Sequence, residues 1–222
     1  MNKRLITIGF LILGIAIIGK LLFFAAKNIK VDDFHKAAII FVIDSSASNQ
    51  KKLPEEIQFT KSLCSILDPE DQIKILKVSE KSYLIYEGSP SDSRGISKAV
   101  EAFTKYNAND YGTAYGEGIK KSLEHCLTMK KEGYVPSVVV IGDLENEGDI
   151  TKQINWETLP SNIKETQKYI PDLSMMFVYA DPEKLDLVKT KLNPVLGEKK
   201  LIIANEANVD KASRRFLEAI GR

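Results

Sequence analysis

The sequence predicts an α/β fold, in which a doubly wound, mostly parallel sheet has helices on both faces and contains one antiparallel strand. Continuous apolar runs rich in Ile and Val alternate with segments of helical periodicity, as is typical of parallel strands that are buried on both faces. Two strand-like segments are separated only by Glu80 and Lys81, and so short a link requires an antiparallel hairpin. This alternation of strands and helices indicates a layered α/β sandwich.

The elements of this sandwich follow one another from residue 37 to the end of the chain. The first strand is the apolar run AAIIFVID, and Pro54 then opens a helix because its fixed φ suits the first helical position. Spacing and composition predict strands at 37–44, 73–79, 82–88, 136–143, 173–181 and from 199, and helices from 54, around 96–103, around 119–127 and over 209–220.

Composition excludes several classes of function. Among the 222 residues, 31 Lys and Arg nearly balance 30 Asp and Glu, so nucleic acid is not an expected partner. There are two histidines and no HExxH or CxxC motif, which argues against a zinc site or a His-based triad. Cys64 and Cys126 are expected to be small buried side chains, and a disulfide between them is the alternative.

The first 26 residues form a separate segment. MNKR precedes an apolar stretch, Leu5 to Ala26, that is long enough to cross a bilayer. We expect an uncleaved anchor at 1–26, a polar stalk at 27–36 and one domain at 37–222. Phe23 or Phe24 falls where a signal peptidase needs a small residue, so a cleaved and secreted form is the less favoured alternative. The basic amino terminus predicts a single-pass membrane protein whose main domain is extracytoplasmic.

The residues that follow the first strand indicate a cation site. In an open α/β sheet the functional crevice lies beyond the carboxyl ends of the strands, where Asp44, Asp143 and Asp181 are expected. Asp44, Ser46 and Ser48 have the spacing i, i+2 and i+4, which points all three side chains to one side of an extended segment. One carboxylate and two hydroxyls are hard oxygen donors that suit Mg²⁺.

These residues, together with two later motifs, resemble the von Willebrand factor A domain. FVIDSSAS is similar to the opening of that family's metal-ion-dependent adhesion site, whose first motif is Asp-x-Ser-x-Ser. YGTAYGEGI then supplies Thr113 within the family's Gly-Thr-x-x-Gly pattern, and VVVIGD supplies Asp143. The three motifs occur in the family's order, and the resemblance covers the chain from about Ala37 to its carboxyl terminus.

The resemblance implies a ligand set and a kind of partner. The implied metal ligands are Asp44, Ser46, Ser48, Thr113 and Asp143. The implied ion is Mg²⁺, with Mn²⁺ and Ca²⁺ as alternatives. In the family one coordination position stays open for a carboxylate of a partner protein, and a metal held by few protein charges attracts such a group strongly.

Several neighbouring residues depart from the family pattern or flank the site. Ala47 replaces a glycine, Asn49 replaces a frequent Met, and Leu144 is expected to alter the mouth of the site. Glu145, Glu147 and Asp149 are expected to form a solvated acidic loop, with repulsion of an acidic partner or attraction of an additional cation as alternatives. Tyr106, Tyr111 and Tyr115 are candidates for a surface that contacts the partner, and Trp156 is expected to pack in the core.

Three functions are compatible with these observations. The favoured one is a membrane-tethered, Mg²⁺-dependent protein-binding module that is not an enzyme. The alternative is a metal-dependent phosphoryl-transfer or hydrolytic enzyme that uses Asp44 as nucleophile, although Ser46 occupies the position where such enzymes carry a second aspartate. The third is a structural domain with no ion in the site and with partners bound elsewhere.

Overall fold

The computed structural model of the chain describes residues 35–101, 103 and 112–222. Of these, His35–Arg222 belong to one compact unit. The expected anchor at 1–26 and most of the stalk at 27–36 lie outside the described residues, as do Tyr106 and Tyr111. No helix within the described ranges combines the length and apolar character that a membrane span requires.

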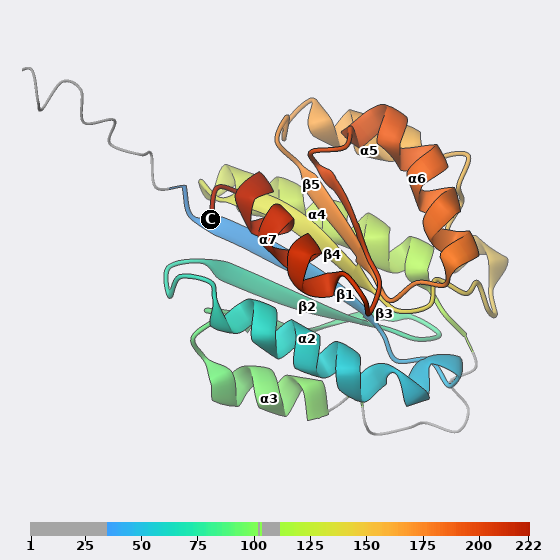
Figure 1. Cartoon of the computed structure of the whole chain (residues 1–222), viewed down its shortest axis with the longest axis horizontal. Coiled ribbons are helices and arrows are strands. Elements are labelled where there is room, and N and C mark those ends of the chain that lie inside the picture. The colour runs from blue at the N-terminus through green and yellow to red at the C-terminus, as the bar shows by residue number, and fades with distance from the viewer. Residues whose placement is uncertain (1–34, 102, 104–111) are drawn as a thin grey trace, which may run out of the picture. The chain divides into compact units, whose positions relative to one another are not determined.

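A six-stranded sheet forms the centre of the domain, with the strand order β3-β2-β1-β4-β5-β6 (Figure 1). β3 is antiparallel to β2, and all other neighbours are parallel, so the predicted fold class and hairpin are confirmed. The strands are β1 (Ala37–Asp44), β2 (Gln72–Val78), β3 (Ser82–Gly88), β4 (Val135–Ile141), β5 (Ser174–Val178) and β6 (Leu201–Ala204).

Helices cover both faces of this sheet. The α-helices among the described residues are α2 (Leu53–Ser65), α3 (Ser93–Glu101), α4 (Tyr115–Lys131), α5 (Leu159–Gln167), α6 (Pro182–Leu196) and α7 (Val209–Ala219). α2, α3 and α7 pack on one face, and α4, α5 and α6 pack on the other (Figure 1). Two short 3-10 helices, η1 (Ser48–Lys51) and η2 (Ile150–Lys152), lie in loops after β1 and β4.

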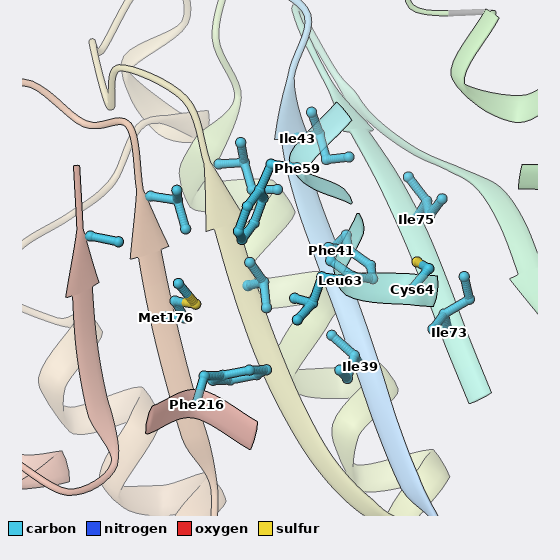
Figure 2. Close-up of a cluster of buried hydrophobic side chains, with 14 of the residues drawn as sticks. Ile39, Phe41, Ile43, Phe59, Leu63, Cys64, Ile73, Ile75, Met176 and Phe216 are labelled. Carbon is cyan, nitrogen blue, oxygen red and sulfur yellow. The ribbon is translucent and has the colours of Figure 1, made fainter. Parts of the chain in front are cut away.

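Side chains of β1 alternate between two separate hydrophobic cores. Ile39, Phe41 and Ile43 point to the α2 and α7 side, where Figure 2 shows them among Phe59 and Phe216. The alternate residues of β1, such as Val42, contact the α4 side. Every residue of β1 is buried, which explains why the sequence of this strand is apolar from Ala37 to Ile43 and makes its last residue, Asp44, a buried acid.

The two cysteines belong to different cores. Cys64 lies in the core on the α2 side and Cys126 in the core on the α4 side, and both are free and buried. The expectation of small buried side chains is therefore confirmed, and the alternative of a disulfide between them is not realised. Burial raises the pKa of the Cys64 thiol to about 12 and also raises the pKa of Cys126.

Two strands end earlier in the structure than the sequence predicts. β4 ends at Ile141 and β5 at Val178, so Asp143 and Asp181 lie in the loops that follow rather than in the strands. Backbone conformation explains the early ends: Gly142 has a φ of 132° and Tyr179 a φ of 66°, and neither value is compatible with an extended strand.

Packing of α7 against the sheet depends on Phe216, whose side chain is fully buried. We expect Phe216→Ala to lower the free energy of unfolding by about 3–5 kcal/mol, because it removes buried apolar surface and leaves a cavity. Leu84→Ala is the control, since Leu84 on the edge strand β3 is 42% exposed. Chemical denaturation of both variants measures the difference, and equal stability losses would contradict this account of the core.

Candidate metal centre

The candidate site lies where the connections of the sheet change direction. β1 and β4 are adjacent in the centre of the sheet, with Ile43 opposite Ile141. The chain leaves β1 toward α2 on one face and leaves β4 toward α5 on the other face. In doubly wound sheets this divergence opens a crevice at the carboxyl ends of the strands. Asp44 and Asp143 both lie at that crevice.

Four of the five predicted ligands form one connected group. The N–H of Ser46 donates to Asp44 Oδ1 at 2.7 Å, which folds the loop back on its own strand. The hydroxyl oxygens of Ser46 and Ser48 are 3.0 Å apart. Ser48 Oγ donates to Asp143 Oδ2 at 3.5 Å, which joins the loop after β1 to the loop after β4.

The backbone of the fifth predicted ligand, Thr113, and of the next residue is bonded to the loops that follow β4 and β2. The N–H of Thr113 donates to the carbonyl of Glu147 at 3.1 Å, in the loop that also carries Asp143. The next N–H, of Ala114, donates to Ser79 O at 2.7 Å, just beyond β2. The Thr113 side chain is 1% exposed, and its hydroxyl has no hydrogen-bond partner among the described residues. A buried hydroxyl without a partner costs free energy, so this oxygen is suited to an ion or a bound water.

Tyr115 connects the first turn of α4 to both central loops. Its hydroxyl donates to Asp44 Oδ2 at 3.0 Å and accepts from the N–H of Leu144 at 3.3 Å. Because Tyr115 is fully buried, the expectation that it contacts a partner on the surface is wrong. Instead, its hydroxyl holds the Asp44 carboxylate in position.

Close packing around this tyrosine requires glycine at position 142. A Cβ atom on Gly142 would lie 2.1 Å from the Tyr115 hydroxyl and 2.6 Å from the Asp44 Cβ. Leu144 follows with a φ of 60° and only 1% exposure. The expectation that Leu144 alters the mouth of the site is therefore wrong, because its left-handed backbone turns the side chain into the core on the α4 side.

Glu56 and Asn49 extend the polar group beneath Asp44, and sequence reasoning did not assign them to the site. Asn49 Nδ2 donates to Glu56 Oε2 at 2.7 Å and to the carbonyl oxygen of Asp44 at 3.2 Å. Glu56 is fully buried, as are its helical neighbours Leu53 and Thr60. The sequence did contain a signal for Glu56. Leu53, Glu56 and Thr60 have the spacing i, i+3 and i+7, which places all three on the buried face of α2.

Burial dominates the electrostatics of these acids. It raises the pKa of Asp44 to about 7, and the nearby charge of Asp143 adds to the rise, although the N–H of Ser46 opposes it. Burial likewise raises the pKa of Glu56 to about 8 and raises the pKa of Asp143. The charge of Lys52 partly opposes the rise in the pKa of Glu56 and of Asp143, but Lys52 also pairs with Asp181 at 3.2 Å. The acids therefore lack a dedicated protein cation.

The donor set fits a hard dication. It consists of carboxylate oxygens from Asp44 and Asp143 and hydroxyl oxygens from Ser46, Ser48 and Thr113, which are ligands that Mg²⁺ and Mn²⁺ accept. Within the described ranges, no group of three or more His, Cys, Asp or Glu side chains is placed to hold a metal. Two carboxylates balance the formal charge of a dication, and the other three donors are neutral hydroxyls, which leave the ion able to attract a further oxygen ligand.

The acidic residues after Asp143 have separate structural roles. Glu145 donates its N–H to Asp143 Oδ1 at 2.8 Å, and its carboxylate lies 3.6 Å from the Lys184 ammonium. Asp149 caps η2 by accepting from the N–H of Thr151 at 2.9 Å, and Glu147 holds Thr113 through its carbonyl. Trp156 packs against the core on the α4 side, as expected.

Comparison with known proteins identifies the family. Residues 38–160 match the model of the von Willebrand factor type A domain, so the chain belongs to this family. No curated protein matches the sequence closely enough to be called a relative.

Solved structures share the fold at low sequence identity. Manganese-loaded TRAP protein from Plasmodium vivax superposes with a TM-score of 0.59 and 10% identity, over 84% of this chain and 74% of that chain. The protein BatB from Bacteroides thetaiotaomicron gives 0.57 and 15%, over 84% and 100% of the two chains. A von Willebrand factor type A protein from Catenulispora acidiphila gives 0.56 and 14%, and this chain covers 84% of its own length but only 43% of that protein.

The burial of Asp44 predicts how stability depends on pH when no divalent ion is bound. A carboxyl whose folded pKa is raised from 3.8 to about 7 destabilises the ionised protein, so stability should fall as pH rises from about 4 to about 7. In chelator at pH 8, Asp44→Asn should therefore have a higher melting temperature than the wild type, and the difference should shrink toward pH 4. The control is Glu132→Gln, an exposed acid at the far end of α4. A wild type more stable than Asp44→Asn at pH 8 in chelator would contradict the assignment.

Proposed function

We propose that this chain is a membrane-tethered, divalent-cation-dependent protein-binding module. In this proposal Asp44, Ser46, Ser48, Thr113 and Asp143 hold Mg²⁺, and the ion offers its remaining position to a carboxylate of a partner protein. A bound dication supplies the positive charge that attracts this carboxylate. Mn²⁺ and Ca²⁺ are alternative ions for the same donors.

The observation that carries the proposal is the unpartnered hydroxyl of Thr113. It is buried two residues before Tyr115, whose hydroxyl donates to Asp44, and burial opposes the ionisation of both Asp44 and Asp143. An ion bound there would satisfy the hydroxyl and neutralise the acids at once. Ser48 is exposed whereas Ser46 is buried, so a partner would approach the ion from the side of Ser48.

The membrane tether and the extracytoplasmic location are part of the same proposal. They are supported by the apolar length of Leu5 to Ala26 and by the basic residues Lys3 and Arg4 that precede it. An adhesive module at the end of a stalk would face its partners directly.

We propose a binding role rather than catalysis, because the side chains in contact with Asp44 are unsuited to act as a second catalytic group. The position two residues after Asp44 is Ser46, and the Tyr115 hydroxyl, which donates to Asp44 Oδ2 at 3.0 Å, has a pKa raised well above its usual range by burial. A buried tyrosine of this kind donates a hydrogen bond and is a poor general base.

Divalent ions should stabilise the protein through Thr113. With the purified chain in detergent, Mg²⁺ or Mn²⁺ at about 100 times its dissociation constant should raise the melting temperature by about 5–10 °C. Thr113→Val should reduce this rise strongly and leave the melting temperature in chelator unchanged or higher, because it replaces an unpartnered buried hydroxyl by a methyl group.

The matched control for this measurement is Thr166→Val, a buried threonine of α5 whose hydroxyl donates to Asn162 O at 3.0 Å. It should lower stability slightly in chelator and keep the full response to Mg²⁺. An undiminished response in Thr113→Val would remove Thr113 from the ligand set, and the absence of any response in the wild type would favour a structural domain without an ion.

Partner capture should depend on the same ion. Membrane proteins retained by the immobilised chain in Mg²⁺ should be released by chelator, and Asp44→Ala or Thr113→Val should weaken retention by about thirtyfold or more. Hydrolysis of a generic phosphomonoester, measured on the same preparations, should be absent. Turnover that is lost in Asp44→Ala would instead support the enzymatic alternative.

A further inference from the structure

A groove runs along the outer edge of the sheet and ends beside the candidate metal centre. It has a volume of about 790 Å³ and lies between α6, the edge strand β6 and the first residues after β5. Its walls include Leu185 and Lys189 of α6, Ile203 of β6 and Arg215 of α7. A volume of this size is typical of sites that bind ligands.

The backbone of β6 presents unused hydrogen-bonding groups to this groove. Within the described residues β6 pairs only with β5, because it ends the strand order. The N–H of Met175 donates to Lys200 O at 2.8 Å and that of Tyr179 to Ala204 O at 3.2 Å, so Lys200, Ile202 and Ala204 face β5. Successive residues of a strand face opposite sides, so Leu201, Ile203 and Asn205 face outward.

Two of these three outward residues are already capped locally. The N–H of Leu201 donates to Gly197 O at 3.0 Å, and the N–H of Asn205 donates to Asn208 Oδ1 at 2.9 Å. Ile203 lies between them, and its N–H and C=O are directed into the groove. An edge with one free residue between two capped ends does not invite extended aggregation, but it can pair with a short segment of another chain.

The chemistry of the groove suits a polypeptide. Leu185, Leu201 and Ile203 form an apolar floor that continues the core on the α4 side. The rim carries charges of both signs, from Lys52, Lys189, Arg215, Asp181, Asp186, Glu198 and Glu206. Such a mixture does not match a polyanion or a lipid tail, whereas a peptide combines a backbone for the edge, apolar side chains for the floor and polar ones for the rim.

One end of the groove is linked to the candidate metal centre through Asp181. Lys52 and Asp181, which are paired at 3.2 Å, line the groove near the end of β5. The N–H of Asp181 donates to Asp143 O at 3.4 Å. A strand added outside β6 would be three strand positions away from β4, or about 15 Å at the usual spacing of neighbouring strands. About five extended residues cover this distance.

We propose that the partner protein binds as an extended segment that pairs with the outer edge of β6 in this groove. This inference rests on the proposed function, since the same partner would place an acidic residue, about five residues from the paired segment, at the metal ion. The pairing would supply sequence-independent backbone hydrogen bonds, and the floor formed by Leu185, Leu201 and Ile203 would select apolar side chains at alternate positions.

The test uses peptides selected in Mg²⁺ from a displayed library of random 16-residue sequences that share one fixed aspartate. Each residue of the tightest peptide is then N-methylated in turn, and binding to the full chain in detergent is measured. A paired segment should lose about tenfold affinity at the position whose N–H donates to the Ile203 C=O, and little at the two neighbouring positions, whose N–H groups face away from β6. Uniform tolerance of N-methylation, or a failure to select any peptide, would overturn the proposal.

Substitutions at Ile203 provide a second measurement on the protein itself. Ile203→Pro removes the outward N–H and should weaken peptide binding by about tenfold while the stabilisation by Mg²⁺ persists, and Ile203→Val, which keeps that N–H, should bind normally. Hydrogen exchange of the Ile203 amide should slow when the peptide binds to the unaltered chain. If Ile203→Pro does not fold, the hydrogen-exchange measurement tests the proposal by itself. Exchange of the Ile203 amide that does not slow when the peptide binds would contradict the proposal.

Chelator separates this inference from the function on which it rests. A peptide that needs Mg²⁺ but loses no affinity at a single position of the N-methyl scan would support the metal-dependent capture and reject the pairing with β6. A peptide that shows this local loss and binds equally well in chelator and to Asp44→Ala would support the pairing and reject the metal-dependent capture.

Discussion

The burial of the Asp44 carboxylate is the constraint on which the candidate site depends. The group has no exposed surface and lies near Asp143, so its ionised form is opposed by lost hydration and by a like charge. The fold offers it the N–H of Ser46 and the hydroxyl of Tyr115, which are dipoles and not charges. A countercharge has to come from outside the protein, or a proton has to be bound.

This constraint also explains why hydroxyl groups complete the donor set. Further carboxylates at positions 46, 48 or 113 would increase the repulsion that already raises the pKa values of Asp44, Asp143 and Glu56. Serine and threonine add oxygen donors without adding charge. These hydroxyls limit the electrostatic repulsion in the folded protein when no ion is bound. They also leave a bound ion able to accept a further oxygen ligand.

The sequence was informative about the fold wherever burial was extreme. β1 is buried along its whole length and was located to the residue, and the short link between β2 and β3 determined their antiparallel pairing. α5 and α6 were not predicted individually. Only Leu159, Ile163 and Thr166 of α5 are buried, and α6 contains Pro194, so neither helix has a strong periodic apolar face. Short or interrupted amphipathic patterns give a weak signal.

The sequence was less informative about the site. The motif residues around Asp44 could be named because their spacing is local, and Thr113 and Asp143 because they resemble a family pattern. The role of Tyr115 depends on a contact with Asp44 across 71 residues, which no local pattern specifies. Asn49 and Glu56 lie only 5 and 7 residues from their partners, but neither belongs to the motif that pointed to the site. The inward turn of Leu144 depends on a left-handed backbone that is rare for leucine.

The placement of the two cysteines has a consequence for following motions of the domain. Each thiol lies in a different core, Cys64 on the inner face of α2 and Cys126 on the inner face of α4, and burial keeps both in the unreactive protonated form. A thiol-specific reagent can modify either one only when the layer above it opens. The chain therefore contains two natural reporters, and the ratio of their labelling rates would reveal which side of the sheet loosens first.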